Sequence, residues 1–318
     1  MTVDSTSSPQ EAVHTPVLLE EVMEFLKVVP GGRYVDATVG EGGHALEIAR
    51  RGGKVLGIDR DPEILEQASR QLGKKAVLVR GNFKDIDQIA QENGFTEADG
   101  ILFDLGISSW HLLSSGRGFS FQRDEPLDMR ADPSLSVTAA DLLNGLTNDE
   151  LEKLFQKFGE EKRAVQLAAA VVRARSVRPF ETTGELVRVV EGTRGNRGKI
   201  PARSASAQRW RARHPATRIF QALRIAVNDE IGNLRSVLPR AFEVLKTGGR
   251  RLEALPGGRL VVVSFHSLED REVKNFFRRM ERSERGVILT KKPLRPPTVE
   301  VSQNPQARSA RLRAMERK

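Results

Sequence analysis

Short apolar runs alternate with helix-like segments through the first hundred residues, and this rhythm restricts the fold more than any other feature. Strands are predicted over residues 33–37, 54–59, 76–80 and 100–104, and residues 62–72, between the second and third strands, have helical spacing. Strands separated by single helices are typical of parallel sheets. The chain is therefore predicted to form a doubly wound, Rossmann-like α/β sheet that binds ligands at the carboxyl ends of its strands.

The rhythm stops after Asp104. Residues 107–217 contain no convincing strand but have helix-like stretches at 149–158 and 161–175, and the next strand pattern begins at Arg259. A helical domain inserted into the sheet domain explains this order. The expected segments are a first sheet part (1–106), a helical insert (107–217), a second sheet part (218–290) and a basic irregular tail (291–318) that is rich in Pro, Ser and Arg.

Composition excludes several kinds of site. The 318 residues include no cysteine, which excludes disulfides and thiolate ligands, and the five histidines are scattered, so we expect no metal. No run of eighteen uncharged apolar residues occurs, and residues 1–10 lack the basic and apolar regions of a signal peptide. We therefore expect a soluble, cytoplasmic protein with no membrane partner.

Charge is distributed unevenly along the chain. Residues 1–150 contain 14 Lys and Arg against 25 Asp and Glu, a net charge of −11, whereas residues 151–318 contain 37 against 17, a net charge of +20. A positive excess attracts nucleic acid, because neutralising phosphates releases condensed counterions; ordinary solubility charge is the alternative. Between Gly192 and Asn228 there are nine Lys and Arg and no Asp or Glu, and we expect Gly192–Arg213 to lie along RNA phosphates.

The turn after the first predicted strand, residues 36–44, is rich in glycine. Glycines let the backbone approach a ligand closely and leave amide N–H groups free at the next helix. Asp59 ends the following strand, where its carboxylate can accept hydrogen bonds from a ribose diol. These features predict a nucleoside cofactor. The spacing of Gly40, Gly42 and Ala45 also fits the dinucleotide fingerprint, so NAD stays an alternative.

Two later strand ends favour a methyl donor. Phe83 follows the third predicted strand, where its ring can pack on adenine, although a core role is the simpler interpretation. Asp104 ends the fourth strand, beside the point where a sulfonium methyl group would lie; a turn or helix-cap role is its alternative. Ligand-side features on four successive strands indicate one binding site.

Several short motifs follow one another between residues 14 and 313. They are HTPVLL from His14, DATVGEGGH from Asp36, DLG from Asp104, RGFSF from Arg117, PLDMR from Pro126, HPATR from His214 continuing to FQALR, SFHSLEDR from Ser264 and RSARLR from Arg308. Each is weak alone, but their colinear order resembles the family of bacterial 16S ribosomal RNA cytosine-N4 methyltransferases. The resemblance implies a class I methyltransferase sheet with S-adenosylmethionine as its cofactor.

The resemblance also implies a substrate and a set of site residues. The partner would be 16S ribosomal RNA or the small ribosomal subunit, with the target cytidine in the decoding region. His111 stands where the family usually has Gln, and because imidazole can still donate or accept one hydrogen bond we expect it at the donor site. The other implied donor-site residues are Gly42, Gly43, His44, Asp59, Phe83 and Asp104.

Cytosine N4 is a poor nucleophile because its lone pair is delocalised into the ring. Catalysis must then come from in-line positioning and from acceptors that hold the amino hydrogens as positive charge develops. Asp104 is the first candidate catalytic residue. The segment after the next strand offers candidates to stack or hydrogen-bond the base; its alternative interpretation is a helix start with Ser267 as N-cap. These candidates are Phe265, His266, Ser267 and Glu269.

Arg224 and Asn228 share one face of a predicted amphipathic helix and are candidates for substrate contact, although amphipathicity alone explains the pattern. Two other functions stay open on the sequence. One is an NAD(P)-dependent oxidoreductase, supported by the glycine turn, and the other is a non-catalytic RNA-binding assembly factor. Titration with S-adenosylmethionine and NAD separates the first from a methyltransferase, and methyl transfer to RNA tests the second.

Overall fold

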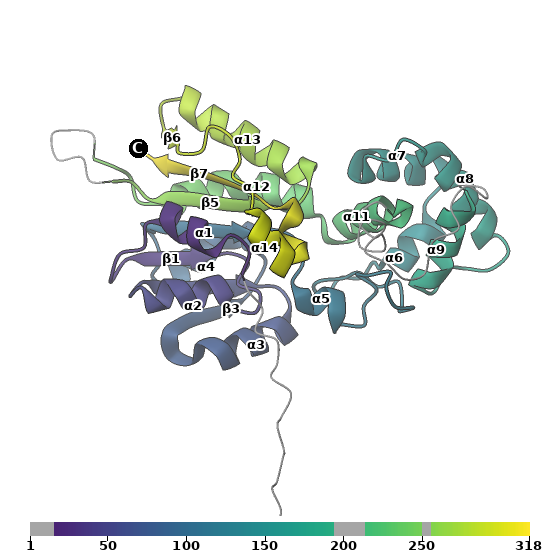
Figure 1. The fold of residues 1–318 in the computed structure, drawn as a ribbon, viewed down its shortest axis with the longest axis horizontal. Helices are drawn as coiled ribbons and strands as arrows, with labels where there is room; N and C mark the ends of the chain where they lie inside the picture. The colour runs from purple at the N-terminus through teal and green to yellow at the C-terminus, as the bar shows by residue number, and fades with distance from the viewer. Residues whose placement is uncertain (1–15, 194–213, 250–255) are drawn as a thin grey trace, which may run out of the picture.

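The computed structural model describes residues 16–193, 214–249 and 256–318, which form a seven-stranded sheet with helices on both faces and a helical body at one end (Figure 1). The strand order is β3-β2-β1-β4-β5-β7-β6, and within these residues β7 alone runs against the other strands. The predicted doubly wound α/β sheet is confirmed. The strands are β1 (Arg33–Asp36), β2 (Lys54–Asp59), β3 (Ala76–Arg80), β4 (Gly100–Asp104), β5 (Arg259–Ser264), β6 (Gly286–Ile288) and β7 (Arg311–Arg317).

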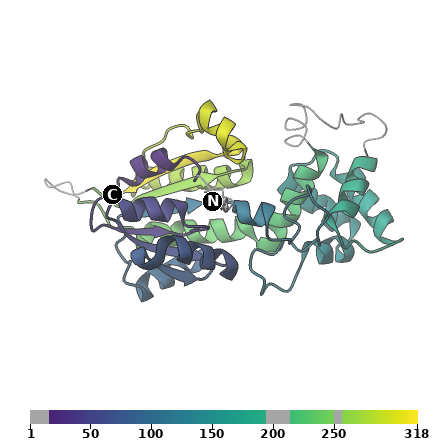
Figure 2. The same ribbon diagram turned by 60° about the horizontal axis from the view of Figure 1, so that its bottom comes forward.

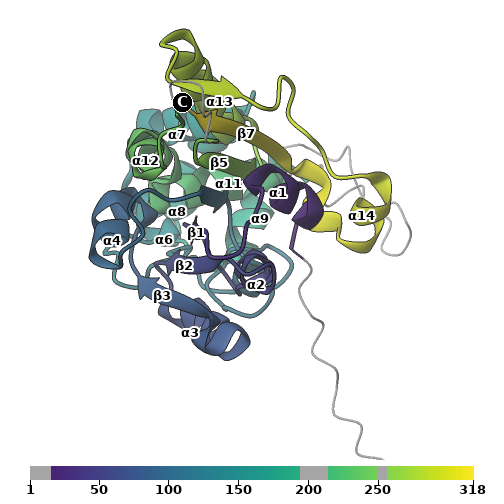
Figure 3. The same cartoon turned by 90° about the vertical axis from the view of Figure 1, so that its left-hand side faces the viewer.

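Each strand alternates its side chains between two apolar cores. Val35 and Leu56 face a core covered by α4, α12 and α13, whereas Tyr34 and Val55 face a core covered by α1, α2 and α3. Figure 3 shows α4 and α12 on one side of the sheet and α1 and α2 on the other. Burial of both faces explains the apolar runs from which the strands were predicted. These helices are α1 (Leu19–Leu26), α2 (Gly43–Arg50), α3 (Pro62–Leu72), α4 (Ile86–Glu92), α12 (Glu230–Val244) and α13 (Ser267–Arg282).

The helical insert has a core of its own and lies beyond one end of the sheet (Figure 2). Its last helix, α11 (Pro215–Asn228), crosses the boundary predicted at residue 217. Phe220, Leu223 and Val227 of α11 pack in the insert core, so the chain re-enters the sheet domain only at Asp229, whose φ of 45° separates α11 from α12. The preceding insert helices are α5 (Ser109–Leu113), α6 (Ala139–Gly145), α7 (Asn148–Gly159), α8 (Ala164–Arg175) and α9 (Thr183–Gly192).

The prediction of an irregular tail over residues 291–318 is wrong. After α14 (Thr298–Gln303) and a short 3-10 helix (Pro305–Ser309), β7 inserts between β5 and β6 as an internal strand. Leu312 is buried in the core beneath α1, and Arg313, also buried, forms an ion pair with Asp270 at 2.6 Å. Three of the arginines that suggested an irregular tail, Arg311, Arg313 and Arg317, are therefore part of a paired strand in which Arg313 is buried.

Two further predictions concern membrane-spanning segments and the basic segment Gly192–Arg213. In the described ranges, no helix is long and apolar enough to cross a membrane. Most of the basic segment expected to contact RNA, residues 194–213 of Gly192–Arg213, lies outside the described residues.

Candidate donor and acceptor site

A cavity of about 360 Å³ opens at the carboxyl ends of the strands. It is lined by the ends of β2 and β4, by residues that follow β1, β3 and β5, by the insert and by the C-terminal segment. This is the position expected for the ligand of a doubly wound sheet. Gly42 does not line it, because its α-carbon faces Leu72 of α3. The predicted donor-site residues that do line the cavity are Gly43, His44, Asp59, Phe83, Asp104 and His111.

The glycine turn is held against the end of β2. Asp59 Oδ2 accepts a hydrogen bond from Gly40 N at 3.1 Å, and Asp59 Oδ1 accepts one from Asp61 N at 3.0 Å. Gly42 has a φ of 95° and precedes α2, a conformation that L side chains rarely adopt. A Cβ on Gly43 would lie 2.4 Å from the Pro16 ring, so the turn approaches the N-terminal HTPVLL segment without room for a side chain.

Asp104 carries the site's least satisfied polar atom. Its N–H donates to Thr38 Oγ1 at 2.7 Å, and its Oδ2 lies 3.6 Å from His44 Nδ1, but its buried Oδ1 has no hydrogen-bond partner among the described residues. Burial, with Asp36 and Glu269 adding repulsion, raises the pKa of Asp104 well above its usual range. A ligand that brings a positive charge beside Asp104 would favour its ionised form.

Asp36, at the end of β1, is a second buried acid behind the cavity. Burial raises its pKa to about 7, although its carboxylate accepts a hydrogen bond from Thr38 N. It does not line the cavity, so its effect on a ligand would act through Asp104.

His111 lines the cavity differently from the prediction, which gave it a hydrogen bond to the donor. Its Nε2 lies 3.0 Å from Asp61 Oδ2 and its Nδ1 lies 3.1 Å from Ser108 Oγ, so both ring nitrogens already have protein partners. Arg117 NH1 also donates to Asp61, at 2.8 Å. Burial alone would raise the pKa of Asp61, but these hydrogen bonds outweigh it and lower that pKa to about 2. His111 therefore contributes its ring to the cavity wall. Its contact with Asp61, and that of Arg117, connect the insert to the loop after β2.

Of the two helix-face candidates for substrate contact, one lines the cavity. Arg224 does so while pairing with Glu230 through two hydrogen bonds of 2.8 and 3.0 Å. Asn228 is buried, and its side chain donates to Met129 O and accepts from Ala131 N at 2.7 and 2.8 Å. Asn228 thus joins the end of α11 to the backbone of residues 129–131. It does not line the cavity, so the structure contradicts the prediction that it contacts substrate.

Among the candidates that follow β5, one lines the cavity and the others do not. Phe265 lines the cavity, whereas Ser267 lies at the start of α13, where its Oγ donates to Glu160 of the insert. The N-cap of α13 is His266 and not Ser267, because His266 Nδ1 accepts from Glu269 N while Glu269 accepts from His266 N. His266 and Glu269 are buried behind the cavity wall.

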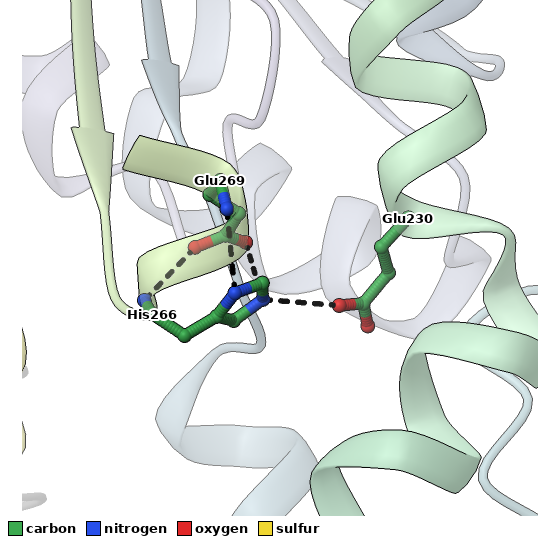
Figure 4. Close-up of side chains that lie close together, drawn as sticks. All are labelled: Glu230, His266 and Glu269. Atoms are coloured by element: carbon green, nitrogen blue, oxygen red, sulfur yellow. Dashed lines mark hydrogen bonds and ion pairs between the residues drawn. The ribbon is translucent and has the colours of Figure 1, made fainter. Parts of the chain in front are cut away.

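A buried charge cluster joins this segment to the insert junction (Figure 4). His266 Nε2 lies 3.2 Å from Glu269 Oε1 and 3.9 Å from Glu230 Oε2, and Arg224 holds the other side of Glu230. Burial lowers the pKa of His266, but the two carboxylates outweigh it and raise that pKa to about 9. The three donor groups of Glu230, His266 and Glu269 lie within 4.8 Å of one another, close enough to hold a metal ion. Arg224 and protonated His266 already balance the two carboxylates.

Sequence reasoning missed several residues of the cavity wall. Thr38 and Glu41 lie inside the recognised glycine turn and could have been proposed from it. In the structure, Glu41 also accepts a hydrogen bond from Trp110 N at 3.2 Å. Arg60 follows Asp59 directly. Gln306 and Ser309 come from the 3-10 helix of the C-terminal segment, which no local pattern connects to the site.

A parallel sheet with one reversed strand, a glycine turn after β1, and acids at the ends of β2 and β4 that line one cavity define a class I methyltransferase that uses S-adenosylmethionine. Gly43, Asp59, Phe83 and Asp104 line the cavity in which that cofactor could bind. When bound, it supplies an electrophilic methyl group on a positively charged sulfur.

The chain belongs to the MraW methylase family, which it matches over residues 11–318. A curated relative from Carboxydothermus hydrogenoformans, named "Ribosomal RNA small subunit methyltransferase H", is 43% identical and covers 96% of this chain and 98% of its own length. A relative of the same name from Heliobacterium modesticaldum is 44% identical with the same coverage. A solved rRNA methylase from Streptococcus thermophilus is 11% identical, with a TM-score of 0.41, and covers 96% of this chain and 99% of its own. Family membership decides for a methyl donor and against NAD.

Proposed function

We propose that this protein transfers a methyl group from S-adenosylmethionine to N4 of a cytidine in the decoding region of 16S ribosomal RNA. The observation that carries the proposal is the 43% identity, over 96% of this chain, with a relative named for methylation of small-subunit ribosomal RNA. The choice of cytidine N4 comes from the family resemblance of the motifs, and the Asp104 carboxylate in the cavity wall supports an N–H nucleophile.

The chemistry of an amino nucleophile fits the groups at the end of β4. As the N–C bond forms and the C–S bond breaks, positive charge builds on N4 and one of its hydrogens must leave as a proton. The Asp104 carboxylate lines the cavity at this point of the sheet, where it can accept a hydrogen bond from the amino group and then take the proton that leaves N4. Binding in the cavity supplies the in-line alignment that a poor nucleophile needs.

Access to the cavity requires the target base to leave its stack. Unstacking a base costs roughly a few kcal/mol, which contacts with the RNA backbone must offset. The net charge of +20 over residues 151–318 supports such contacts, and Arg194, Arg197, Arg203, Arg209 and Arg211 are the residues we propose to make them.

Mass mapping of 16S ribosomal RNA from cells with and without the gene tests the proposal. The expected result is one cytidine in the decoding region that loses an N4-methyl group when the gene is deleted and regains it with the wild-type gene but not with an Asp104→Asn gene. An unchanged methylation pattern would refute the target, and a change at another nucleotide would reassign it. Purified protein should then be assayed on free RNA and on assembled subunits.

A further inference from the structure

Phe265 lies one strand beyond the groups that are expected to hold the donor. In strand order β3-β2-β1-β4-β5, Phe83 after β3 and Asp59 after β2 mark the nucleoside end of the cavity, and Asp104 after β4 marks the methyl end. Phe265 follows β5, one strand further on, and lines the same cavity. By this order, the space beside Phe265 adjoins the expected methyl end and is the part of the cavity left for the acceptor.

The ring of Phe265 packs against the backbone that follows Asp104. A Cβ on Gly106, whose φ is +108°, would lie 3.3 Å from Phe265 Cδ2, so Gly106 lets the ring approach closely. Phe265 is only partly buried, unlike the neighbouring Ser264 and His266. Within the described part of the chain, Phe83 and Phe265 are the phenyl rings of the cavity wall, one at each end.

We propose that Phe265 is the aromatic platform on which the target base stacks while its amino group faces Asp104. The proposal rests on the function proposed above and names the residue that holds the base. Aromatic side chains bind unstacked bases through their flat faces, and this interaction is typical of proteins that recognise single-stranded RNA.

The buried cluster fixes the backbone of this platform. Glu269 Oε2 accepts hydrogen bonds from Phe265 N at 2.8 Å and from His266 N at 3.2 Å. His266 and Glu230 then connect Glu269 to Arg224 of the insert. Glu269 is thus a positioning residue, which holds Phe265 without touching the base.

Phe265→Leu tests the platform, because it removes the ring but keeps an apolar side chain. With RNA as the varied substrate and saturating donor, we expect kcat/KM to fall about 10- to 100-fold, the range associated with loss of one base–aromatic stack. Donor affinity, measured by calorimetry without RNA, should stay within about twofold of wild type. Phe265→Tyr, which keeps the ring, should recover most of kcat/KM.

Phe83→Leu is the matched control at the other end of the cavity and should show the opposite pattern, with weaker donor binding and little change in kcat at saturating donor. A Phe265→Leu enzyme with wild-type kcat/KM for RNA would overturn the proposal, and so would a loss of donor affinity as large as that of Phe83→Leu. If the wild-type enzyme does not methylate ribosomal RNA, the proposed function fails instead.

A fluorescent base reports stacking directly. With RNA carrying pyrrolo-cytidine at the mapped target, emission in the bound complex should be lowest with the wild-type protein, higher with Glu269→Gln and highest with Phe265→Leu. Equal emission in the wild-type and Phe265→Leu complexes would contradict the platform. Equal quenching by wild type and Glu269→Gln would remove Glu269 from its positioning role.

Discussion

The donor end and the acceptor end of the cavity are built in different ways. The donor end comes from strand ends that are close in sequence, from the glycine turn at residues 36–44 to Asp104. The proposed acceptor end has Phe265 after β5, and the same cavity is also lined by Arg224 of the insert and Gln306 of the C-terminal segment. A cofactor site can therefore be encoded by one local unit, whereas the substrate site depends on how distant parts of the chain meet.

The contacts that bring these parts together are largely polar. The insert has its own apolar core, distinct from the two cores of the sheet. Ion pairs cross the junction between Arg224 and Glu230, between Arg117 and Asp61, and between Arg271 and Glu160. Changes at the donor end should therefore alter donor affinity, whereas changes at the acceptor end and the junction should alter rate and stability.

The largest effect is expected for Asp104→Asn, which keeps the size of the side chain but removes the carboxylate acceptor. We expect kcat to fall about 100- to 1000-fold, as for loss of one preorganised electrostatic contact in a transition state. Because the pKa of Asp104 is raised by burial and by Asp36, the wild-type rate should increase with pH as Asp104 ionises, and the Asp104→Asn rate should not. Rates measured at saturating donor across pH check both points.

Asp36→Asn is the matched control for this prediction, since it removes a buried acid that does not line the cavity. It should keep kcat within about threefold and move the acidic limb of the profile to lower pH, because Asp36 no longer opposes ionisation of Asp104. An acidic limb that stays in the Asp104→Asn enzyme would show that another group titrates.

His266→Asn should destabilise the junction in a pH-dependent way. Glu230 of α12 and Glu269 of α13 face His266, with Arg224 of α11 beyond them and Glu160 nearby. Burial and Arg224 lower the pKa of His266, but Glu269 and Glu230 outweigh them and raise it from 6.5 to about 9. A raised pKa means that protonated His266 stabilises the fold fully below about pH 6.5, and that this contribution is lost as pH rises through 9. The shift corresponds to at most about 3 kcal/mol.

Chemical denaturation at several pH values measures this effect. Asparagine can still cap α13, so the replacement removes mainly the charge. The free energies of unfolding of wild type and variant should differ most near pH 6 and converge by pH 10. A difference that does not change with pH would contradict a charged His266 in the cluster.

The smallest effect is expected for Arg117→Lys at the other polar link. Arg117 donates to Asp61 and to Glu63, both at 2.8 Å, and its guanidinium lies over Trp110. A lysine ammonium cannot make this forked contact, so we expect a loss of about 1–2 kcal/mol in the free energy of unfolding. Donor affinity should fall no more than about fivefold, because His111 still holds Asp61.

Arg235→Lys is the control for the Arg117 variant, because Arg235 makes a similar forked pair with Glu272 on the exposed surface. It should change the free energy of unfolding by less than about 1 kcal/mol. Equal effects of the two variants would show that the junction contact is no stronger than a surface ion pair.

The sequence predicted the donor end well for a physical reason. Strand, glycine turn and helix follow from local residue patterns, and α3 begins at Pro62 and ends at Leu72 as predicted. The end of the insert was not predictable, because the apolar face of α11 could have packed against either the sheet or the insert, and only the structure shows that it packs in the insert core. Nor was β7, whose arginines become buried only through pairing with β5 and with Asp270, distant in sequence. The contacts of His111 were not predictable either, because its ring nitrogens contact Asp61, which is distant in sequence, and Ser108.

The rate of methyl transfer to ribosomal RNA as a function of donor concentration tests most directly whether the two ends are separate. Asp59→Ala removes the carboxylate that we expect to accept hydrogen bonds from the donor ribose. Loss of a charged hydrogen-bond partner costs about 1.5–3 kcal/mol, so the half-saturating donor concentration should rise about 10- to 150-fold. Its maximal rate should nevertheless approach that of the wild type, whereas Asp104→Asn should stay far below at any donor concentration. Restoration of the Asp104→Asn rate by excess donor, or a low plateau for Asp59→Ala, would contradict the division.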